Sequence, residues 1–139
     1  MTTEDQYKLA TDSLNGRLFV PYQREGVQWM LGMENQSDGP KGGFLCDEMG
    51  LGKTVQLIST ILGNPQSRTL IIVPKSIITQ WHEEIQKFAP NLTVNIYDGN
   101  ERKVCSDSHI TIAPYTLLTI KGAEVGAPTP LHYLYSTLR

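Results

Sequence analysis

Apolar residues recur with the period of a helix in three parts of the chain. The first part follows Pro21, which suits the first turn of a helix because its missing N–H costs no hydrogen bond there. The second opens at Lys53 and is stopped at 63–65, and the third follows Ser76, whose side chain can cap a helix. The apolar positions are Val27, Met30 and Leu31, then Val55, Ile58, Ile61 and Leu62, then Ile77, Ile78, Trp81, Ile85 and Phe88. We therefore predict three helices that each bury one face.

Four other runs are short and rich in apolar or β-branched residues, as in strands. They are residues 44–46, 69–73, 93–97 and 109–113. The first two are wholly apolar, which is typical of strands buried on both faces, whereas the third alternates and has one wetter face. A short turn of helix is expected at 115–120. Because strands and helices alternate, the sequence predicts an α/β fold with a parallel sheet covered by helices.

The N-terminal part of the chain carries a weaker pattern. Residues 1–16 are polar without a clear period, so we expect a polar leader there and one domain over residues 17–139. The leader lacks the basic start and apolar core of a signal peptide. No run approaches the roughly 18 apolar residues that a membrane span needs, so no membrane partner is indicated.

Composition narrows the classes of function. The chain is 40% apolar and 19% charged, as in an ordinary globular protein. Its formal net charge is −2, so no bulk positive field attracts nucleic acid and any DNA contact must be local. Cys46 and Cys105 are too few for a disulfide framework and lack the spacing of metal ligands, which fits a reducing compartment. We expect Cys46 to be a small buried residue of the first strand.

Residues 43–54, GFLCDEMGLGKT, join a predicted strand, a glycine-bearing turn and the start of a predicted helix. Gly50 and Gly52 remove side chains where the backbone must bend tightly or approach a ligand. At the helix start, backbone N–H groups and the positive end of the helix dipole favour an anion. Lys53 adds a mobile charge for the β- and γ-phosphates of a nucleotide, and the hydroxyl of Thr54 can ligate Mg²⁺. The stretch therefore predicts a phosphate-binding loop.

A second interpretation of this stretch is a glycine-rich turn with an incidental Lys-Thr pair. The strict phosphate-loop pattern has a glycine at the position of Asp47, so the match is incomplete at one residue. The predicted strand before the turn and the predicted helix after it favour the nucleotide site. Its ligand is expected at the carboxyl ends of the parallel strands. The pattern alone predicts a nucleotide-binding α/β domain, but it does not predict which reaction the domain catalyses.

Several ordered motifs resemble those of Swi/Snf-type DNA-dependent ATPases, in helicase superfamily two. Residues 18–29 resemble the adenine-recognition segment of that family, and 47–54 its first ATPase motif, in which Asp in place of the leading Gly is usual. Residues 70–84 resemble the next motif, which follows the DNA backbone, and 110–118 the segment before the acidic motif. The matching residues are Leu18, Pro21, Tyr22, Gln23, Gly26, Val27 and Trp29; Asp47, Glu48, Met49, Gly50, Leu51, Gly52, Lys53 and Thr54; Leu70–Pro74, Gln80, Trp81 and Glu84; and Ile110–Tyr115, Leu117 and Leu118. Ala113-Pro114 departs slightly from the Thr-Thr or Thr-Pro common there.

The resemblance implies a RecA-like fold, in which a parallel sheet with a phosphate-binding loop is flanked by helices. It implies that Gln23 reads the edge of adenine, so that ATP is preferred over GTP, and that residues 47–54 hold the phosphates of ATP with Mg²⁺ on Thr54. Lys75 and Ser76 become candidates for contact with a phosphate of double-stranded DNA, although Lys75 can equally be an exposed surface lysine. The family implies roles in chromatin remodelling or DNA repair, and a nuclear location in a eukaryotic cell. Met30, Met33 and Glu34 point to its RING-finger-bearing DNA-repair subgroup.

The acidic motif of the family, Asp-Glu followed by Ala-His or similar, does not occur in this sequence, and neither does the second motor lobe with its arginine fingers. Such arginines contribute about 10³–10⁵ in rate. We expect a lobe truncated before the acidic-motif strand, which binds ATP without appreciable turnover alone and belongs to a longer protein. The alternative is a stand-alone ATP-binding or interaction module that has lost its catalytic half. An unrelated kinase or GTPase is disfavoured because the adenine segment lies upstream.

Overall fold

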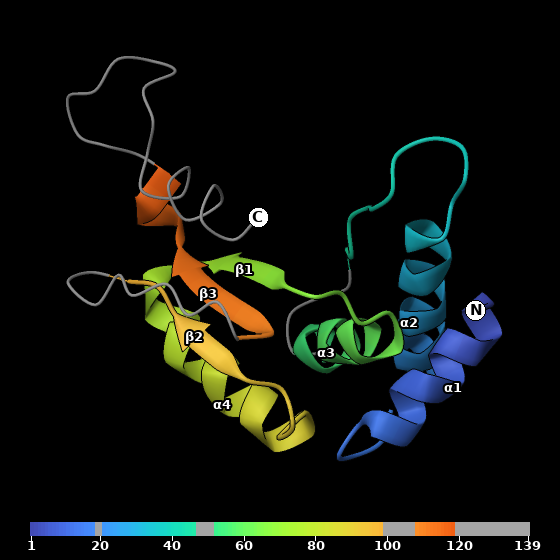
Figure 1. Ribbon diagram of the computed structural model, residues 1–139, viewed down its shortest axis with the longest axis horizontal. Helices are drawn as coiled ribbons and strands as arrows, with labels where there is room; N and C mark the ends of the chain where they lie inside the picture. Colours follow the sequence, from blue (N-terminus) through green and yellow to red (C-terminus); the bar gives the residue numbers. More distant parts are fainter. Residues whose placement is uncertain (19–20, 47–51, 99–107, 119–139) are drawn as a thin grey trace. The chain divides into compact units, whose positions relative to one another are not determined.

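The computed structural model describes residues 1–18, 21–46, 52–98 and 108–118, and Figure 1 shows their elements. The chain divides into two compact units. Unit 1 comprises Met1–Gln66 and Glu84–Pro90, and unit 2 comprises Ser67–Glu83 and Asn91–Arg139. We describe each unit by itself.

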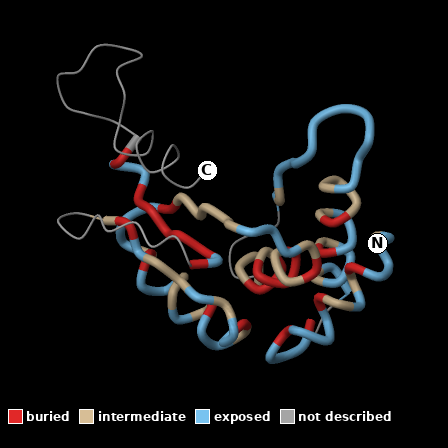
Figure 2. The backbone as a smooth tube through the Cα atoms, in the orientation of Figure 1, coloured by how far each residue is buried: buried red, intermediate tan, exposed pale blue. Residues whose placement is uncertain are grey.

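Unit 1 is built on three helices: α1 (Thr3–Ser13), α2 (Pro21–Glu34) and α3 (Lys53–Gly63). Each of these helices contacts the other two. The two that the sequence predicts are confirmed, including the start of α2 at Pro21 and the end of α3 at Gly63. Figure 2 shows their buried positions in red, and the buried apolar residues of the three helices are Ala10, Val27, Leu31, Val55 and Ile58.

All three helices come close together at Gly63. A Cβ atom there would lie 2.7 Å from the Gln6 carbonyl oxygen, 3.0 Å from the Ala10 Cβ and 3.3 Å from the Leu31 Cδ1. Real Cβ atoms do not approach a backbone oxygen so closely, so only glycine lets α1 and α2 pack against the end of α3 at this distance.

Helix α1 occupies residues for which the sequence pattern predicts no helix. Its two buried residues are Gln6 and Ala10, neither of which is strongly apolar, so the helical period is weak in the sequence. The helix is started by a capping box: the Asp5 N–H donates to the Thr2 Oγ1 at 3.1 Å, and the Thr2 N–H donates to the Asp5 Oδ2 at 3.1 Å. Local capping and packing against α3, rather than a wide apolar stripe, therefore define α1.

A chain of side-chain hydrogen bonds joins the ends of the three helices. The Gln6 Nε2 donates to the Asn64 Oδ1 at 3.3 Å, and the Asn64 Nδ2 donates to the Glu34 Oε2 at 2.6 Å. The Asn35 Nδ2 donates to the Gln6 Oε1 and, at 3.1 Å, to the Thr3 Oγ1. These bonds satisfy the buried amide of Gln6, which explains why a polar residue occupies this position.

After α1, the chain passes over the end of helix α4 (Ile78–Phe88), whose last residues belong to unit 1. The Asn15 N–H donates to the Phe88 carbonyl at 2.8 Å, and the Asn15 Nδ2 donates to the Lys87 carbonyl at 2.9 Å. These carbonyls lie in the last turn of α4, where no intrahelical donor reaches them. Asn15 therefore supplies the missing partners, and residues 14–16 are part of the folded unit.

Unit 2 contains a parallel sheet of β1 (Thr69–Val73), β2 (Val94–Ile96) and β3 (Ile110–Pro114), in the order β1-β3-β2. Thr69 pairs with Ile110, and Val94 also pairs with Ile110, so β3 is central (Figure 1). All five residues of β3 are buried, as Figure 2 shows. The parallel sheet that the sequence predicts is confirmed, with β2 and β3 within one residue of their predicted bounds.

Short helical turns follow two of the strands. After β1 comes η1 (Lys75–Ile77), and after β3 comes η2 (Tyr115–Leu118). The turn predicted at 115–120 is confirmed over 115–118, and residues 119–120 lie outside the described residues. The prediction that Ser76 caps the next helix is wrong, because Ser76 lies inside η1 and α4 begins at Ile78. Proline at 74 fixes the backbone where the strand ends, so a tight turn comes between the strand and the helix.

The predicted buried strand at 44–46 is also wrong. These residues are not in a strand, Phe44 is 89% exposed and Cys46 is exposed. A strand of a parallel sheet needs neighbours for its backbone groups, and in the described part of the chain no strand pairs with this run. It lies instead near α2: a Cβ at Gly43 would be 2.7 Å from the Trp29 ring.

Candidate nucleotide-binding site

Helix α3 begins at a residue in the left-handed conformation. Gly52, its N-cap, has φ +79° and ψ +38°, a conformation that side chains disfavour. The Gln56 N–H donates to the Gly52 carbonyl at 3.2 Å as the first bond of the helix. The N–H groups of Lys53, Thr54 and Val55 come before it and have no partner within the helix. This helix start can therefore accept an anion, as the sequence predicts.

The structure brings Gln23 to this same point. A Cβ on Gly52 would meet the Gln23 Nε2 and lie 3.3 Å from the Gln23 Cδ, so the amide lies against the start of α3. One turn further along α2, a Cβ on Gly26 would lie 3.1 Å from the Cδ of the buried Gln56. Glycines on both helices thus permit the close approach that places a polar amide beside the helix start.

The hydroxyl of Thr54 differs from the other hydroxyls of α3. The Ser59 Oγ donates to the Val55 carbonyl at 2.7 Å, and the Thr60 Oγ1 donates to the Gln56 carbonyl at 2.9 Å. Thr54 lies in the first turn, where no helical carbonyl exists four residues earlier. It is half-buried, as is Lys53. Their predicted roles toward the phosphates and Mg²⁺ stay predictions.

The remaining residues of the predicted loop, Asp47, Glu48, Met49, Gly50 and Leu51, lie outside the described residues. Their predicted part in binding ATP stays a prediction.

The two candidates for DNA contact lie in unit 2, at the carboxyl end of β1. Lys75 and Ser76 are both exposed residues of η1. The Lys75 Nζ is 3.9 Å from the Oδ2 of Asp98, which follows β2, and their side chains are 67% and 23% exposed. The carboxyl ends of parallel strands lie at one edge of a sheet, so this pairing could have been foreseen, although no sequence motif marks Asp98 as a site residue. An ion pair this long and exposed is weak, and Lys75 remains able to bind another anion.

The parallel sheet with its flanking helices defines a protein of the parallel α/β class. The family model of the SNF2-related domain matches residues 22–128, and the chain belongs to this family. In the part that the structure describes, no helix has both the length and the apolar character needed to cross a membrane.

Solved structures agree with this family. The SWI2/SNF2 ATPase core of Sulfolobus solfataricus in complex with dsDNA is 33% identical and superposes with a TM-score of 0.67, covering 76% of this chain and 23% of that chain. The same core domain, in a second structure, has 31% identity and a TM-score of 0.63 over 81% of this chain and 24% of that one. The predicted α/β, RecA-like fold class and the resemblance to Swi/Snf-type ATPases are confirmed.

Curated relatives carry the same family's names. An uncharacterized ATP-dependent helicase of Mycoplasma genitalium is 41% identical over 105 residues, which are 72% of this chain and 10% of the relative. The ATP-dependent helicase rhp16 of Schizosaccharomyces pombe is 41% identical over 90 residues, 63% of this chain and 10% of the relative. Helicase SWR1 of Cryptococcus neoformans is 39% identical over 89 residues, 60% of this chain and 7% of the relative. The chain thus spans about a tenth of the length of such relatives.

Proposed function

We propose that this chain is the ATP-binding portion of a Swi/Snf-type DNA-dependent ATPase or translocase. The observation that carries the proposal is the contact of the Gln23 amide with Gly52, which joins a base-reading group to a phosphate-binding helix start. Residues 17–139 then correspond to the N-terminal part of the first motor lobe, preceded by the polar residues 1–16. Relatives named ATP-dependent helicases support the choice of ATP.

Each residue of the site has a chemical role in this proposal. The backbone N–H groups at the start of α3 and the loop Asp47–Leu51 hold the phosphates, and Lys53 supplies a positive charge at the β- and γ-phosphates. The Thr54 hydroxyl holds Mg²⁺, which would neutralise phosphate charge when bound. Gln23 donates to and accepts from the edge of adenine, because an amide offers both groups.

The motor as a whole would act on double-stranded DNA, with the second motor lobe supplied by the same longer protein. The solved relative bound to dsDNA supports this partner. Lys75 and Ser76, exposed at the carboxyl end of β1, are the proposed contacts to a DNA phosphate. Chromatin remodelling or DNA repair is the proposed process, in the nucleus where the cell is eukaryotic.

The substitution Lys53→Ala tests the nucleotide site. Hydrogen bonds to charged groups contribute about 1.5–3 kcal/mol, so the Kd for Mg–ATP should rise at least about tenfold. Lys41→Ala is the matched control, because Lys41 is an exposed lysine of the loop after α2 and the change in net charge is the same. Titration calorimetry on the whole chain provides the measurement. Equal ATP affinity in wild type and Lys53→Ala would remove the assignment.

A further inference from the structure

Helices α2 and α3 contact each other at both ends. At their first turns the Gln23 amide lies against Gly52, and at their last turns the Asn64 Nδ2 donates to the Glu34 Oε2 at 2.6 Å. Two further contacts lie between these ends: Gly26 with Gln56, and the Met30 sulfur with the Thr60 Oγ1 at 3.8 Å. The two helices therefore run side by side in the same direction, and the pairing at one end constrains the other.

Helix α1 holds the far ends of this pair together. The buried Gln6 uses both ends of its amide, because its Nε2 donates to the Asn64 Oδ1 at 3.3 Å and its Oε1 accepts from the Asn35 Nδ2. Asn64 is the C-cap residue of α3, and Asn35 directly follows α2. Hydrogen bonds are directional, and a buried polar network can specify one arrangement of the elements that it joins. Gln6 therefore favours one orientation of α2 relative to α3.

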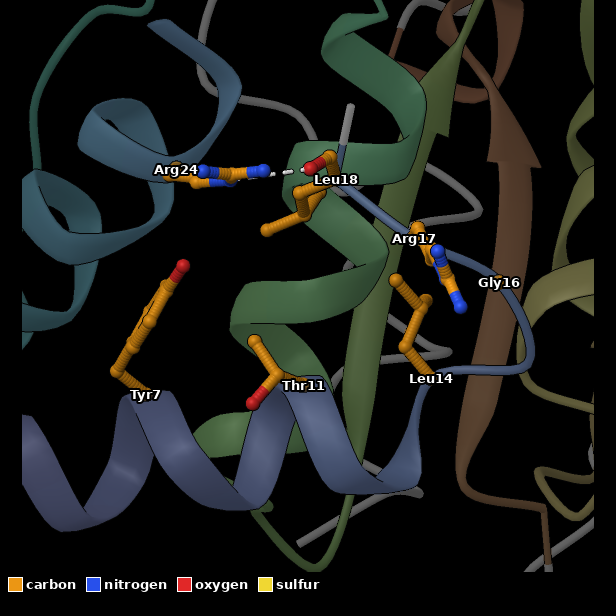
Figure 3. Close-up of a pocket in the computed structure, with 7 residues that line it drawn as sticks. All are labelled: Tyr7, Thr11, Leu14, Gly16, Arg17, Leu18 and Arg24. Atoms are coloured by element: carbon orange, nitrogen blue, oxygen red, sulfur yellow. Dashed lines mark hydrogen bonds between the residues drawn. The ribbon is translucent and has the colours of Figure 1, made fainter. Parts of the chain in front are cut away.

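Helix α1 is also fixed at its other end. The linker from α1 leads to α2, and the Arg24 Nε donates to the Leu18 carbonyl of this linker at 3.1 Å, as the dashed line in Figure 3 shows. Leu14 and Leu18 are buried, and the Tyr7 ring extends from α1 toward Arg24. Because α1 is anchored in this way, the hydrogen bonds of Gln6 can orient the other two helices.

The position of Gln23 is sensitive to how the far ends are paired. Residues 23 and 34 are about 16 Å apart along α2, since each residue of a helix adds about 1.5 Å. A tilt of about 4° at the far end would therefore move Gln23 by about 1 Å. The groups of a binding site must be held within about 0.5 Å of their productive geometry. The contact of Gln23 with Gly52 thus depends on a fixed far end.

We propose that Gln6 is a positioning residue of the ATP site, which holds Gln23 against the start of α3 and so maintains a preference for ATP over GTP. The inference rests on the proposed function, in which Gln23 reads the edge of adenine. It gives a part in nucleotide recognition to a residue outside the region that the family model matches, since that region begins at residue 22. Lys53 and the N–H groups that bind phosphate all belong to α3, so they keep their mutual geometry when α2 shifts.

The test measures the binding of Mg–ATP, Mg–GTP and tripolyphosphate to the full chain by titration calorimetry. Gln6→Met keeps the length of the side chain and removes both hydrogen bonds, and Gln28→Met is the matched control at an exposed glutamine of α2. One hydrogen bond contributes about two- to tenfold to an equilibrium, so Gln6→Met should lower the ratio of ATP to GTP affinity by that factor. Tripolyphosphate has no base, so its affinity should not change. Gln28→Met should bind all three ligands as wild type does.

A double-mutant cycle separates positioning from a general loss of stability. Gln23→Met removes the base-reading amide and should bring the affinities for ATP and GTP close together. Adding Gln6→Met to Gln23→Met should change their ratio no further, because the group that Gln6 positions is then absent. A further change in the ratio in that background would show that Gln6 acts by another route, which overturns the inference.

Gln6 is buried, so each variant is first tested for cooperative thermal unfolding. If Gln6→Met does not fold, Asn35→Ala decides, because Asn35 is exposed and its substitution removes the donor to the Gln6 Oε1. It should lower the ratio about twofold. An unchanged ratio in the deciding variant overturns the inference, as does an equal loss of affinity for all three ligands or a wild type that binds ATP and GTP equally. In these cases ATP binding itself stands, whereas a wild type that binds none of the three ligands refutes the proposed function.

Discussion

Gly63 is a residue at which α1, α2 and α3 pack closely. Gly63→Ala places a Cβ 2.7 Å from the Gln6 carbonyl oxygen, and a backbone oxygen cannot rotate away as a side chain can. The gain in helix propensity, up to about 1 kcal/mol, is smaller than the cost of overpacking, about 1–3 kcal/mol. We expect net destabilisation by about 1–2 kcal/mol, measured as a lower midpoint of urea unfolding at constant slope.

Gly32 on α2 is the matched control for that substitution. A Cβ there meets no atom within 4 Å, and its φ is not in the left-handed range. Gly32→Ala should therefore raise the stability by about 0.5–1 kcal/mol, since alanine restricts the unfolded chain and favours the helix. If both alanines shift the midpoint in the same direction, the close approach at Gly63 is not what limits the packing.

Helix α1 depends on its cap more than on an apolar stripe. Thr2→Ala removes the acceptor for the Asp5 N–H, and loss of an N-cap hydroxyl costs about 0.5–2 kcal/mol. We expect fraying of the first turn of α1, seen as a loss of helical ¹³Cα shifts by NMR at residues 3–6. Ser13→Ala, at the exposed other end of α1, should leave these shifts unchanged.

The same cap should depend on pH. Hydrogen bonds from the Thr2 side chain and backbone lower the pKa of Asp5 below its ordinary value of 3.8. A lowered folded-state pKa means that the stabilisation is complete above the unfolded value and is lost as the pH falls through the lowered value. The difference between wild type and Thr2→Ala should therefore be full at pH 6 and shrink below pH 3.8. A difference that stays constant to pH 2 would contradict the role of the Asp5 carboxylate.

The elements differ in how far the sequence predicts them, for physical reasons. The strand β1 is a run of apolar and β-branched residues closed by Pro74, so its bounds follow from composition and are confirmed. The run at 44–46 is also short and apolar. A strand, however, needs a neighbouring strand to pair with its backbone groups, and the local sequence pattern does not show whether one is present. Helix α1 is the reverse case, because its buried positions are Gln6 and Ala10, which carry little hydrophobic signal.

The candidate site shows the same division between local and tertiary information. The glycine at position 52 and the Lys-Thr pair after it are read directly from the motif, and the left-handed φ of Gly52 agrees with that reading. The contact of Gln23 with Gly52 depends on how α2 packs on α3, which no spacing along the chain encodes. Only the resemblance to a known family could relate these two residues in advance.

Charge is the property that belongs to the whole molecule. With a formal net charge of −2, the chain gains little from long-range attraction to DNA, so any affinity must arise from local cations such as Lys75. The same lysine faces Asp98 at 3.9 Å, and a DNA phosphate would compete with that carboxylate for it. Neutralising one acidic residue at a time can therefore decide whether the proposed binding of DNA depends on the net charge or on the local ion pair.

Asp98→Asn and Asp38→Asn each remove one negative charge, but only the first removes the partner of Lys75. An exposed ion pair contributes about 0–1 kcal/mol, so Asp98→Asn should raise the affinity for a short DNA duplex by up to about fivefold at low salt. Asp38, exposed in the loop after α2, should give a smaller change. Fluorescence anisotropy in 50 mM and 200 mM salt measures both, and adding Lys75→Ala should abolish the gain of Asp98→Asn. An equal increase in DNA affinity from the two substitutions would mean that net charge determines DNA binding. Lys75 would then make no specific contribution to it.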